Sequence, residues 1–452
     1  MFLKVKYAIK LLAQNLSMSE IDTHRLAKAA RLIMEYEKRP SKADDFLETK
    51  NILSYKYGEE RRICQFIFLT VLRNKLIIEA ILAKFLKKTP RPGLFALLKC
   101  AAAEILASDE SKLASIIHAW VETAKQNFSM GESKLANAIL RKFAPAYTEF
   151  KSSAKSLEDF ALLYSHPLWL AKSWKEQFGE EKAIEIMKLD NRPSDVFFRL
   201  STTSSAKNVF LPYLERFEKT PLENFFKLKR GSFSKVSELL KTPHVYIQDP
   251  ATRFAPLALN PKGGAILDLC AAPGGKSRAI IDMLLASPQN AKGASLVAVD
   301  IDSPRLKRLR ENLEKVESFK TEILPCDLLS ENLADKLKDA ELPTSFNYIL
   351  LDAPCSNTGV LRRRPDARYR ISIKDIENCK LIQIKLIKTA AKLLKQGGRL
   401  VYSTCSIDKR ENEDAPTEAL KDFPDLRISS MKTHLPDEDS DGAGICVIER
   451  QI

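Results

Sequence analysis

Two patterns of apolar residues divide the chain. In the first third, apolar side chains recur every three or four residues, which is the spacing of one face of an α-helix. This spacing is clear over residues 63–72, 77–86 and 94–106, and the segment Pro90-Arg-Pro-Gly93 interrupts it. We therefore predict a compact all-α domain over residues 1–145.

The last part of the chain alternates short apolar runs with helix-like segments. The runs that we expect to be buried strands are residues 265–269, 296–300, 321–325, 348–352 and 399–404. Strands that alternate with helices are typical of a parallel sheet with helices on both faces. Residues 256–452 are therefore predicted to form an α/β domain.

Residues 146–255 mix the two patterns. A helix is expected to begin near Tyr164 and to run on through Ile184, and short β-like stretches with basic and aromatic residues follow it. Such a region suits a small RNA-facing platform, but an ordinary α+β linker domain explains it equally well.

Composition adds charge to this picture. The chain has 72 Lys and Arg against 58 Asp and Glu, a net charge of +14, which favours a polyanionic partner such as nucleic acid over no such partner. Its eight cysteines include no C-x-x-C pair, so neither a metal site nor a disulfide framework is expected. Lysines interrupt the N-terminal residues 1–10 and no apolar run approaches 18 residues, so we expect a cytoplasmic protein without a membrane segment.

The segment Ala265–Ser277 reads as strand, glycine turn and helix. Gly274 and Gly275 allow backbone N–H groups to approach a ligand, and the following helix N-terminus favours negative charge such as a carboxylate. The spacing is neither G-x-G-x-x-G nor that of the phosphate-binding loop, which argues against a phosphate site. Taken alone, the segment is compatible with any nucleotide site or with a plain turn.

Aspartates close three of the predicted strands. Asp300 follows Gly274 by 26 residues, about where an acid that binds a ribose stands in a nucleotide-binding unit, and Asp327 and Asp352 follow the next two strands. One such aspartate is commonly a helix cap. Three of them beside a glycine turn predict a nucleoside pocket.

Two cysteines follow the fourth and fifth predicted strands. If these strands are neighbours, about 4.8 Å apart, Cys355 and Cys405 come from adjacent loops into one crevice. A single cysteine is usually a small buried apolar residue. Two at strand ends beside a nucleoside pocket favour chemistry instead.

Three segments carry a family resemblance: Asp268–Lys276, Leu351–Asp366, and Tyr402–Ser406 together with Glu411-Asn-Glu413. They resemble the signature segments of the Sun (Nol/Nop/Sun) family of RNA cytosine-C5 methyltransferases. Residues 136–143 resemble the end of the NusB-like domain in the bacterial small-subunit ribosomal RNA methyltransferase B group. The resemblance implies a Rossmann-like catalytic domain after a NusB-like domain.

The resemblance also implies site residues. It makes Cys405 the nucleophile and Cys355 the cysteine that releases the product, and it places the ribose of S-adenosylmethionine on Asp300, its adenine near Asp327 and its reactive end near Asp352. The residues implied to line this cofactor are Cys270, Ala271, Ala272, Pro273, Gly274, Gly275 and Lys276. No metal is implied.

The implied substrate is a single-stranded or loop cytosine of small-subunit (16S) ribosomal RNA, bound by a monomer. A tRNA or another RNA, DNA, or a non-catalytic role in ribosome assembly are the alternatives. One departure concerns Asp441-Gly-Ala-Gly444, where the family often has Asp-Gly-Phe-Phe. This departure leaves the local packing or a base contact open.

The chemistry explains the need for two thiols. C5 of cytosine is a poor nucleophile until a thiolate adds at C6 and turns C5 into an enamine-like carbon. Asp352 is expected to stabilise N3 of the base as the adduct forms. After methylation the C5 proton has to leave, and Cys355, or a water that it orients, is the expected base.

Overall fold

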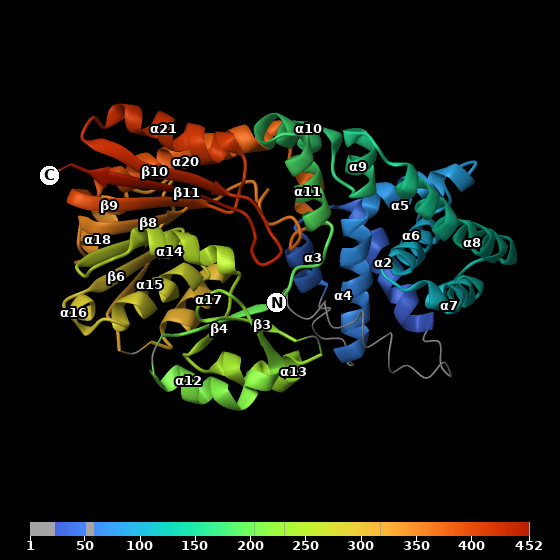
Figure 1. Cartoon of the computed structure of the whole chain (residues 1–452), viewed down its shortest axis with the longest axis horizontal. Coiled ribbons are helices and arrows are strands. Elements are labelled where there is room, and N and C mark those ends of the chain that lie inside the picture. The colour runs from blue at the N-terminus through green and yellow to red at the C-terminus, as the bar shows by residue number, and fades with distance from the viewer. Residues whose placement is uncertain (1–22, 51–57, 203, 230, 317, 452) are drawn as a thin grey trace. The chain divides into compact units, whose positions relative to one another are not determined.

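The computed structural model describes the chain apart from residues 1–22, 51–57, 203, 230, 317 and 452 (Figure 1). The lysine-interrupted N-terminal residues 1–10 lie outside the described residues. Within the described part, no helix combines the length and the apolar character needed to cross a membrane. The chain divides into two compact units: one runs to Ser194 and includes Leu361–Arg370, and the other comprises Asp195–Val360 and Ile371–Ile452.

The first unit is helical. Its described helices are α2 (Thr23–Lys38), α3 (Ala43–Thr49), α4 (Gly58–Arg73), α5 (Lys75–Phe85), α6 (Pro92–Leu106), η3 (Glu110–Lys112), α7 (Leu113–Asn127), α8 (Met130–Ser153), α9 (Leu157–Leu163), α10 (Leu168–Phe178), α11 (Glu180–Asp190) and α19 (Ala367–Arg370). Large side chains such as Phe68, Trp120 and Phe143 are fully buried in its core. The predicted all-α character is confirmed. The helix predicted to continue through Ile184 is wrong in one respect, because Gly179, with a φ of 87°, separates α10 from α11.

Residues 361–370 follow the loop that carries Cys355 (residues 353–360, the Cys355 loop). They nevertheless belong to the helical unit. Arg368 is fully buried there, and its guanidinium donates hydrogen bonds to backbone carbonyls. The acceptors are the oxygens of Arg73, Tyr164, Ser165 and Asp190. These ten residues therefore depart from the surrounding α/β part of the chain, and the buried hydrogen bonds of Arg368 hold them in the helical unit.

The second unit begins with a small antiparallel sheet of order β2-β3-β1-β4 among the described strands. The strands are β1 (Phe197–Leu200), β2 (Phe217–Lys219), β3 (Phe225–Leu228) and β4 (Val245–Ile247), and the accompanying helices are α12 (Ser204–Phe210), η4 (Leu211–Arg216), α13 (Phe233–Val236), η5 (Ser237–Lys241), η6 (Pro250–Arg253) and α14 (Phe254–Leu259). Arg199 of β1 forms a buried ion pair with Asp282, at 2.6 Å between Nη1 and Oδ2. This pair ties the small sheet to the helix behind the glycine turn.

A larger sheet of order β10-β11-β9-β8-β5-β6-β7 follows in the described chain (Figure 1). Its strands are β5 (Ala265–Leu269), β6 (Ser295–Asp300), β7 (Thr321–Pro325), β8 (Phe346–Asp352), β9 (Leu394–Thr404), β10 (Leu426–His434) and β11 (Ala443–Arg450). The helices between them are α15 (Gly275–Leu285), α16 (Pro288–Ala291), α17 (Pro304–Leu313), α18 (Leu333–Asp339), α20 (Ile373–Lys392), the π-helix η7 (Arg410–Asp414), α21 (Ala415–Ala419) and η8 (Leu420–Asp422). The predicted α/β fold is confirmed.

Two strands extend this sheet beyond the prediction. β11 pairs antiparallel with β9, and β10 pairs antiparallel with β11, so the sheet is mixed. β10 is a largely exposed edge strand, and its polar sequence lacks the apolar run by which the five parallel strands were predicted.

The strand order decides where the loops meet. β8 lies between β5 and β9, and all three are parallel, so their carboxyl ends share one edge of the sheet. Leu269 stands opposite Leu351, and Asp352 stands opposite Ser403. The glycine turn between β5 and α15, the Cys355 loop after β8 and the loop after β9 that carries Cys405 (residues 405–409, the Cys405 loop) therefore leave the sheet side by side.

Candidate active site

The glycine turn between β5 and α15 is held by neighbouring elements. Gly274 has a φ of 96°, and a Cβ at this position would lie 2.9 Å from the Leu309 side chain of α17, so a glycine is required. The Ala272 N–H donates to Asp300 Oδ2 at 2.7 Å, and the Asn312 side chain donates to the Pro273 carbonyl at 2.7 Å. The turn is thus tied to the end of β6 and to α17.

Carboxylates gather around this turn. Burial raises the pKa of Cys270, and the nearby carboxylates of Asp300, Asp352 and Asp268 raise it further. Asp268 is fully buried, which raises its pKa to about 7. Its Oδ2 accepts a hydrogen bond from Ser277 at 2.5 Å, whereas Oδ1 has no hydrogen-bond partner among the described residues. The turn therefore lies among acidic side chains, and Oδ1 of Asp268 is left as an unused buried acceptor among the described residues.

Lys276 and Asp352 form an ion pair across neighbouring strand ends. The Nζ–Oδ2 distance is 2.6 Å, and Ser403 donates to the other oxygen of Asp352 at 3.3 Å. Burial acts to lower the pKa of Lys276, but Asp352, and to a smaller extent Cys405, outweigh this, so that the pKa is raised. A negative charge on Cys405 therefore favours the charged form of Lys276.

Asp327 is engaged in its own turn. Its Oδ1 accepts from the Leu329 N–H at 3.0 Å and its Oδ2 from the Ser330 hydroxyl at 2.8 Å. These hydrogen bonds lower the pKa of Asp327. The position at the end of β7 agrees with the sequence, and a contact with adenine stays a prediction.

The structure brings the two predicted cysteines together. Cys355 Sγ and Cys405 Sγ are 3.1 Å apart, and both residues are partly exposed. The hydrogen bond with Cys405 raises the pKa of Cys355 well above its ordinary value, and burial adds to this effect. Asn357 completes the arrangement, because its Oδ1 accepts from Cys405 Sγ at 3.3 Å and its Nδ2 donates to the Cys355 carbonyl at 2.9 Å.

Backbone hydrogen bonds join the two cysteine loops. The Gly359 N–H donates to the Cys405 carbonyl at 3.0 Å, and the Gly442 N–H donates to the Gly359 carbonyl at 2.8 Å. A Cβ at Gly359 would lie 2.9 Å from the Cys405 carbonyl oxygen and 2.8 Å from that of Gly442. Sequence reasoning missed Asn357, Gly359 and Gly442 as site residues, and their only signal was their place beside the two cysteine motifs.

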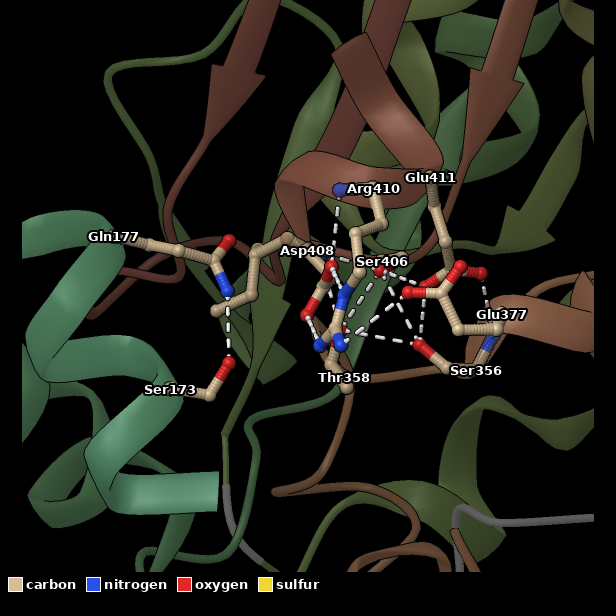
Figure 2. A network of polar contacts seen from close by, with 10 residues as sticks. Ser173, Gln177, Ser356, Thr358, Glu377, Ser406, Asp408, Arg410 and Glu411 are labelled. Atoms are coloured by element: carbon tan, nitrogen blue, oxygen red, sulfur yellow. Dashed lines mark hydrogen bonds and ion pairs between the residues drawn. The ribbon is translucent and has the colours of Figure 1, made fainter. Parts of the chain in front are cut away.

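A buried polar network also lies behind the thiols. It joins residues from the Cys355 loop, the Cys405 loop and the π-helix η7, and Figure 2 shows Ser356, Ser406 and Glu411 meeting in it. The sequence motif Glu411-Asn-Glu413 was noted without a role for any of its members. The three residues differ in exposure in the structure: Glu411 and Asn412 are buried, whereas Glu413 is partly exposed.

Gly444 explains the packing of Asp441–Gly444, the segment in which the sequence differs from the family pattern. This residue of β11 stands opposite Thr404 of β9, and a Cβ here would lie only 2.0 Å from Oδ1 of Asn412. Asn412 uses this space to accept from Thr404 Oγ1 at 2.6 Å and to donate to the Ser406 carbonyl at 3.0 Å. These two partners flank Cys405, so the glycine leaves room for a side chain that holds the Cys405 loop.

Within the described part of the chain, no group of three or more His, Cys, Asp or Glu side chains is arranged so that it could hold a metal ion.

Comparison with known proteins identifies two family models that match this chain. Residues 256–447 match the family model described as 16S rRNA methyltransferase RsmB/F, and residues 17–145 match the NusB family model. The chain is 32% identical to the ribosomal RNA small subunit methyltransferase B of Vibrio cholerae over 70% of this chain and 72% of that protein. It is 28% identical to the probable ribosomal RNA small subunit methyltransferase B of Bacillus subtilis over 81% of each chain.

A solved structure adds to these matches. The methyltransferase homolog protein from Pyrococcus horikoshii is 27% identical, with a TM-score of 0.53, over 66% of this chain and all of that one. The match of residues 256–447, the NusB match and the likeness to relatives over most of the chain all indicate the same family. The chain belongs to the RsmB/F family of S-adenosylmethionine-dependent 16S rRNA methyltransferases, with a NusB-family domain ahead of the catalytic domain.

Proposed function

We propose that this protein transfers a methyl group from S-adenosylmethionine to C5 of a cytosine in 16S ribosomal RNA, through a covalent bond between Cys405 and C6 of the base. The observation that carries the proposal is the distance of 3.1 Å between the sulfurs of Cys355 and Cys405. At this distance both thiols can reach one pyrimidine ring, one to add to it and one to assist its release.

The glycine turn fits the proposed cofactor. S-Adenosylmethionine carries a sulfonium and an ammonium group, and the carboxylates of Asp268, Asp300 and Asp352 surround the turn that would hold it. Asp300 would hold the ribose, and Asp327 would lie near the adenine. When bound, S-adenosylmethionine supplies the methyl group. Residues Cys270–Lys276 would line it and Asp352 would lie beside its reactive end.

Cys405 is the better nucleophile of the two thiols. The hydrogen bond between the sulfurs raises the pKa of Cys355, so Cys355 keeps its proton and can donate a hydrogen bond to a thiolate on Cys405. The Lys276 ammonium, whose pKa the Cys405 charge helps to raise, also stabilises that thiolate. The Cys405 thiolate then forms a bond to C6, and C5 gains the electron density needed to accept the methyl group.

Formation of the adduct changes the role of Cys355. Once the sulfur of Cys405 is bonded to C6, the thiolate that holds the proton on Cys355 no longer exists, and the largest cause of its raised pKa is removed. Cys355 can then take the proton from C5, directly or through a water. As the C5–H bond breaks, the electron pair expels Cys405 as a thiolate. Asp352 would stabilise N3 of the base while the adduct exists.

The test is the fate of the adduct in two variants. Cys355→Ala incubated with S-adenosylmethionine and a 16S rRNA fragment is expected to accumulate a denaturant-resistant protein–RNA adduct, whereas Cys405→Ala is expected to form none. The same incubation with tRNA and with a DNA strand of matched sequence compares the substrate classes. Adducts in neither variant, or methylation by Cys405→Ala, would contradict the proposal. Binding of S-adenosylmethionine without methyl transfer to any RNA would favour a non-catalytic assembly factor.

A further inference from the structure

The carboxylate of Glu411 lies behind the two thiols and contacts both of their loops. Glu411 belongs to the π-helix η7 (Figure 2), and its side chain is fully buried. Its Oε1 accepts from the Ser356 N–H at 2.9 Å, and its Oε2 accepts from the hydroxyls of Ser356, at 2.5 Å, and Ser406. Ser356 follows Cys355 directly and Ser406 follows Cys405 directly. One carboxylate thus connects the residues adjoining both thiols.

Gln383 extends this connection to the other side of Cys355. This fully buried residue of α20 donates from one amide nitrogen to Glu411 Oε1 and to the Pro354 carbonyl, both at 2.9 Å. Pro354 and Ser356 flank Cys355 in the sequence. The Cys355 loop is therefore held on both sides of its thiol by Glu411 and by a partner of Glu411.

All four contacts of the Glu411 carboxylate come from donors: one backbone N–H, two hydroxyls and one amide. A buried carboxylate is costly unless its oxygens accept several hydrogen bonds, and these four compensate for the burial. Replacement by an apolar residue would leave buried donors without an acceptor and would release the two loops from one another.

We propose that Glu411 is a positioning residue for methyl transfer: its carboxylate holds the Cys355 and Cys405 loops at one separation, so that both thiols act on the same base. The inference rests on the proposed function for its catalytic consequence. The holding of the loops can be measured without catalysis. Glu411 lies behind the loop backbones and acts through them, so no contact with the cofactor or the base is required.

The first measurement is the rate at which Cys355 and Cys405 form a disulfide with diamide, which accepts the two electrons and two protons that the thiols lose. Peptide mass spectrometry follows the linked pair in the full-length protein. Because Sγ–Sγ contact depends on the loop separation, Glu411→Ala is expected to slow this reaction about tenfold or more. Glu411→Gln, which keeps one acceptor oxygen, is expected to restore much of the rate.

The second measurement is steady-state methylation. Glu411→Ala is expected to lower kcat about 100-fold, while the affinity for S-adenosylmethionine stays within about twofold, since the glycine turn is untouched. Glu413→Ala is the matched control, because Glu413 lies two residues away in the same π-helix, is 45% exposed and pairs only loosely with Lys409, at 3.6 Å. This control is expected to behave as the wild type in both measurements.

A disulfide rate in Glu411→Ala within about twofold of the wild-type rate would overturn the inference. An equal loss of kcat and of cofactor affinity would also overturn it, because it would indicate general damage to the domain. If Glu411→Ala does not fold, Ser356→Ala, which removes one hydroxyl contact of Glu411, is compared with the wild type by the same two measurements, and wild-type values in both measurements would overturn the inference. A disulfide rate that depends on Glu411 in a protein that methylates no RNA would support the loop-holding role and refute the proposed function instead.

Discussion

Lys276 Nζ lies 2.6 Å from Asp352 Oδ2, and this ion pair joins the glycine turn after β5 to the end of the neighbouring strand β8. The lysine is the first-turn residue of α15, and the aspartate precedes the Cys355 loop by three positions. The Lys276 ammonium therefore connects the proposed cofactor site to the strand that leads to Cys355. Its influence on Cys405 gives a prediction.

Lys276→Met is expected to lower the methylation rate near neutral pH about tenfold or more, because the Cys405 thiolate loses a stabilising cation. The rate is expected to recover partly as the pH rises, so the pH–rate profile moves to higher pH. Steady-state rates from pH 6 to pH 10 measure this shift. Lys307→Met, at an exposed lysine of α17, is the control, and an unchanged profile in Lys276→Met would contradict the role given to this ammonium.

Asp268 makes stability depend on pH. Burial raises its pKa from 3.8 to about 7, so the fold favours the protonated carboxyl. The corresponding stability is fully present below about pH 4 and is lost as the pH rises through about 7, with an upper limit of about 4 kcal/mol. Asn at this position stays neutral, so Asp268→Asn is expected to lose less stability than the wild type between pH 5 and 8.

Chemical denaturation at several pH values measures this difference. Asp335→Asn, at an exposed residue of α18, is expected to follow the wild-type curve. Parallel curves for Asp268→Asn and the wild type would show that the buried carboxyl does not titrate in this range.

Gly444→Ala tests the packing behind Cys405. The new methyl group would lie 2.0 Å from Asn412 Oδ1, so Asn412 has to move away from Thr404 and Ser406. We expect a loss of about 1–3 kcal/mol in stability from overpacking, and a loss of kcat of about tenfold or more with little change in cofactor affinity. Gly131→Ala, at a glycine of α8 with open space around it, is the control for denaturation and kinetics. Wild-type kinetics in Gly444→Ala would show that Asn412 does not position Cys405.

Arg368→Met tests how strongly Arg368 stabilises the packing of residues 361–370 in the helical unit. The substitution leaves four backbone carbonyls without this donor, and we expect it to cost about 3 kcal/mol or more of unfolding free energy. Arg368→Lys is expected to recover little, because one ammonium cannot reproduce a planar fork of donors. Urea denaturation measures both variants. Equal stability of Arg368→Met and the exposed-site variant Lys374→Met would contradict this account.

Local pattern was sufficient to predict much of the catalytic domain. The five parallel strands, the glycine turn and the acids after the strands were predicted from runs of apolar residues and from the residues that end them, since burial and turn geometry depend on neighbours in the sequence. Asp327 shows the limit of such reasoning. Its place at the end of β7 follows from the sequence, but the engagement of its carboxylate by Leu329 and Ser330 depends on the detailed shape of the turn.

The sequence by itself determined that the chain has an all-α part and an α/β part, where the five parallel strands end, and that a cysteine follows each of the last two of these strands. Tertiary structure decided that β8 lies beside β9, that the sulfurs are 3.1 Å apart, and that Glu411 reaches the residues next to both. It also decided that residues 361–370 belong to the helical unit and that Gly444 makes room for Asn412. The physical reason is that the spacing of apolar residues along the sequence indicates only which face of a helix or strand is buried. Hydrogen bonds between segments some 50 residues apart depend on strand order and on the space that side chains leave one another.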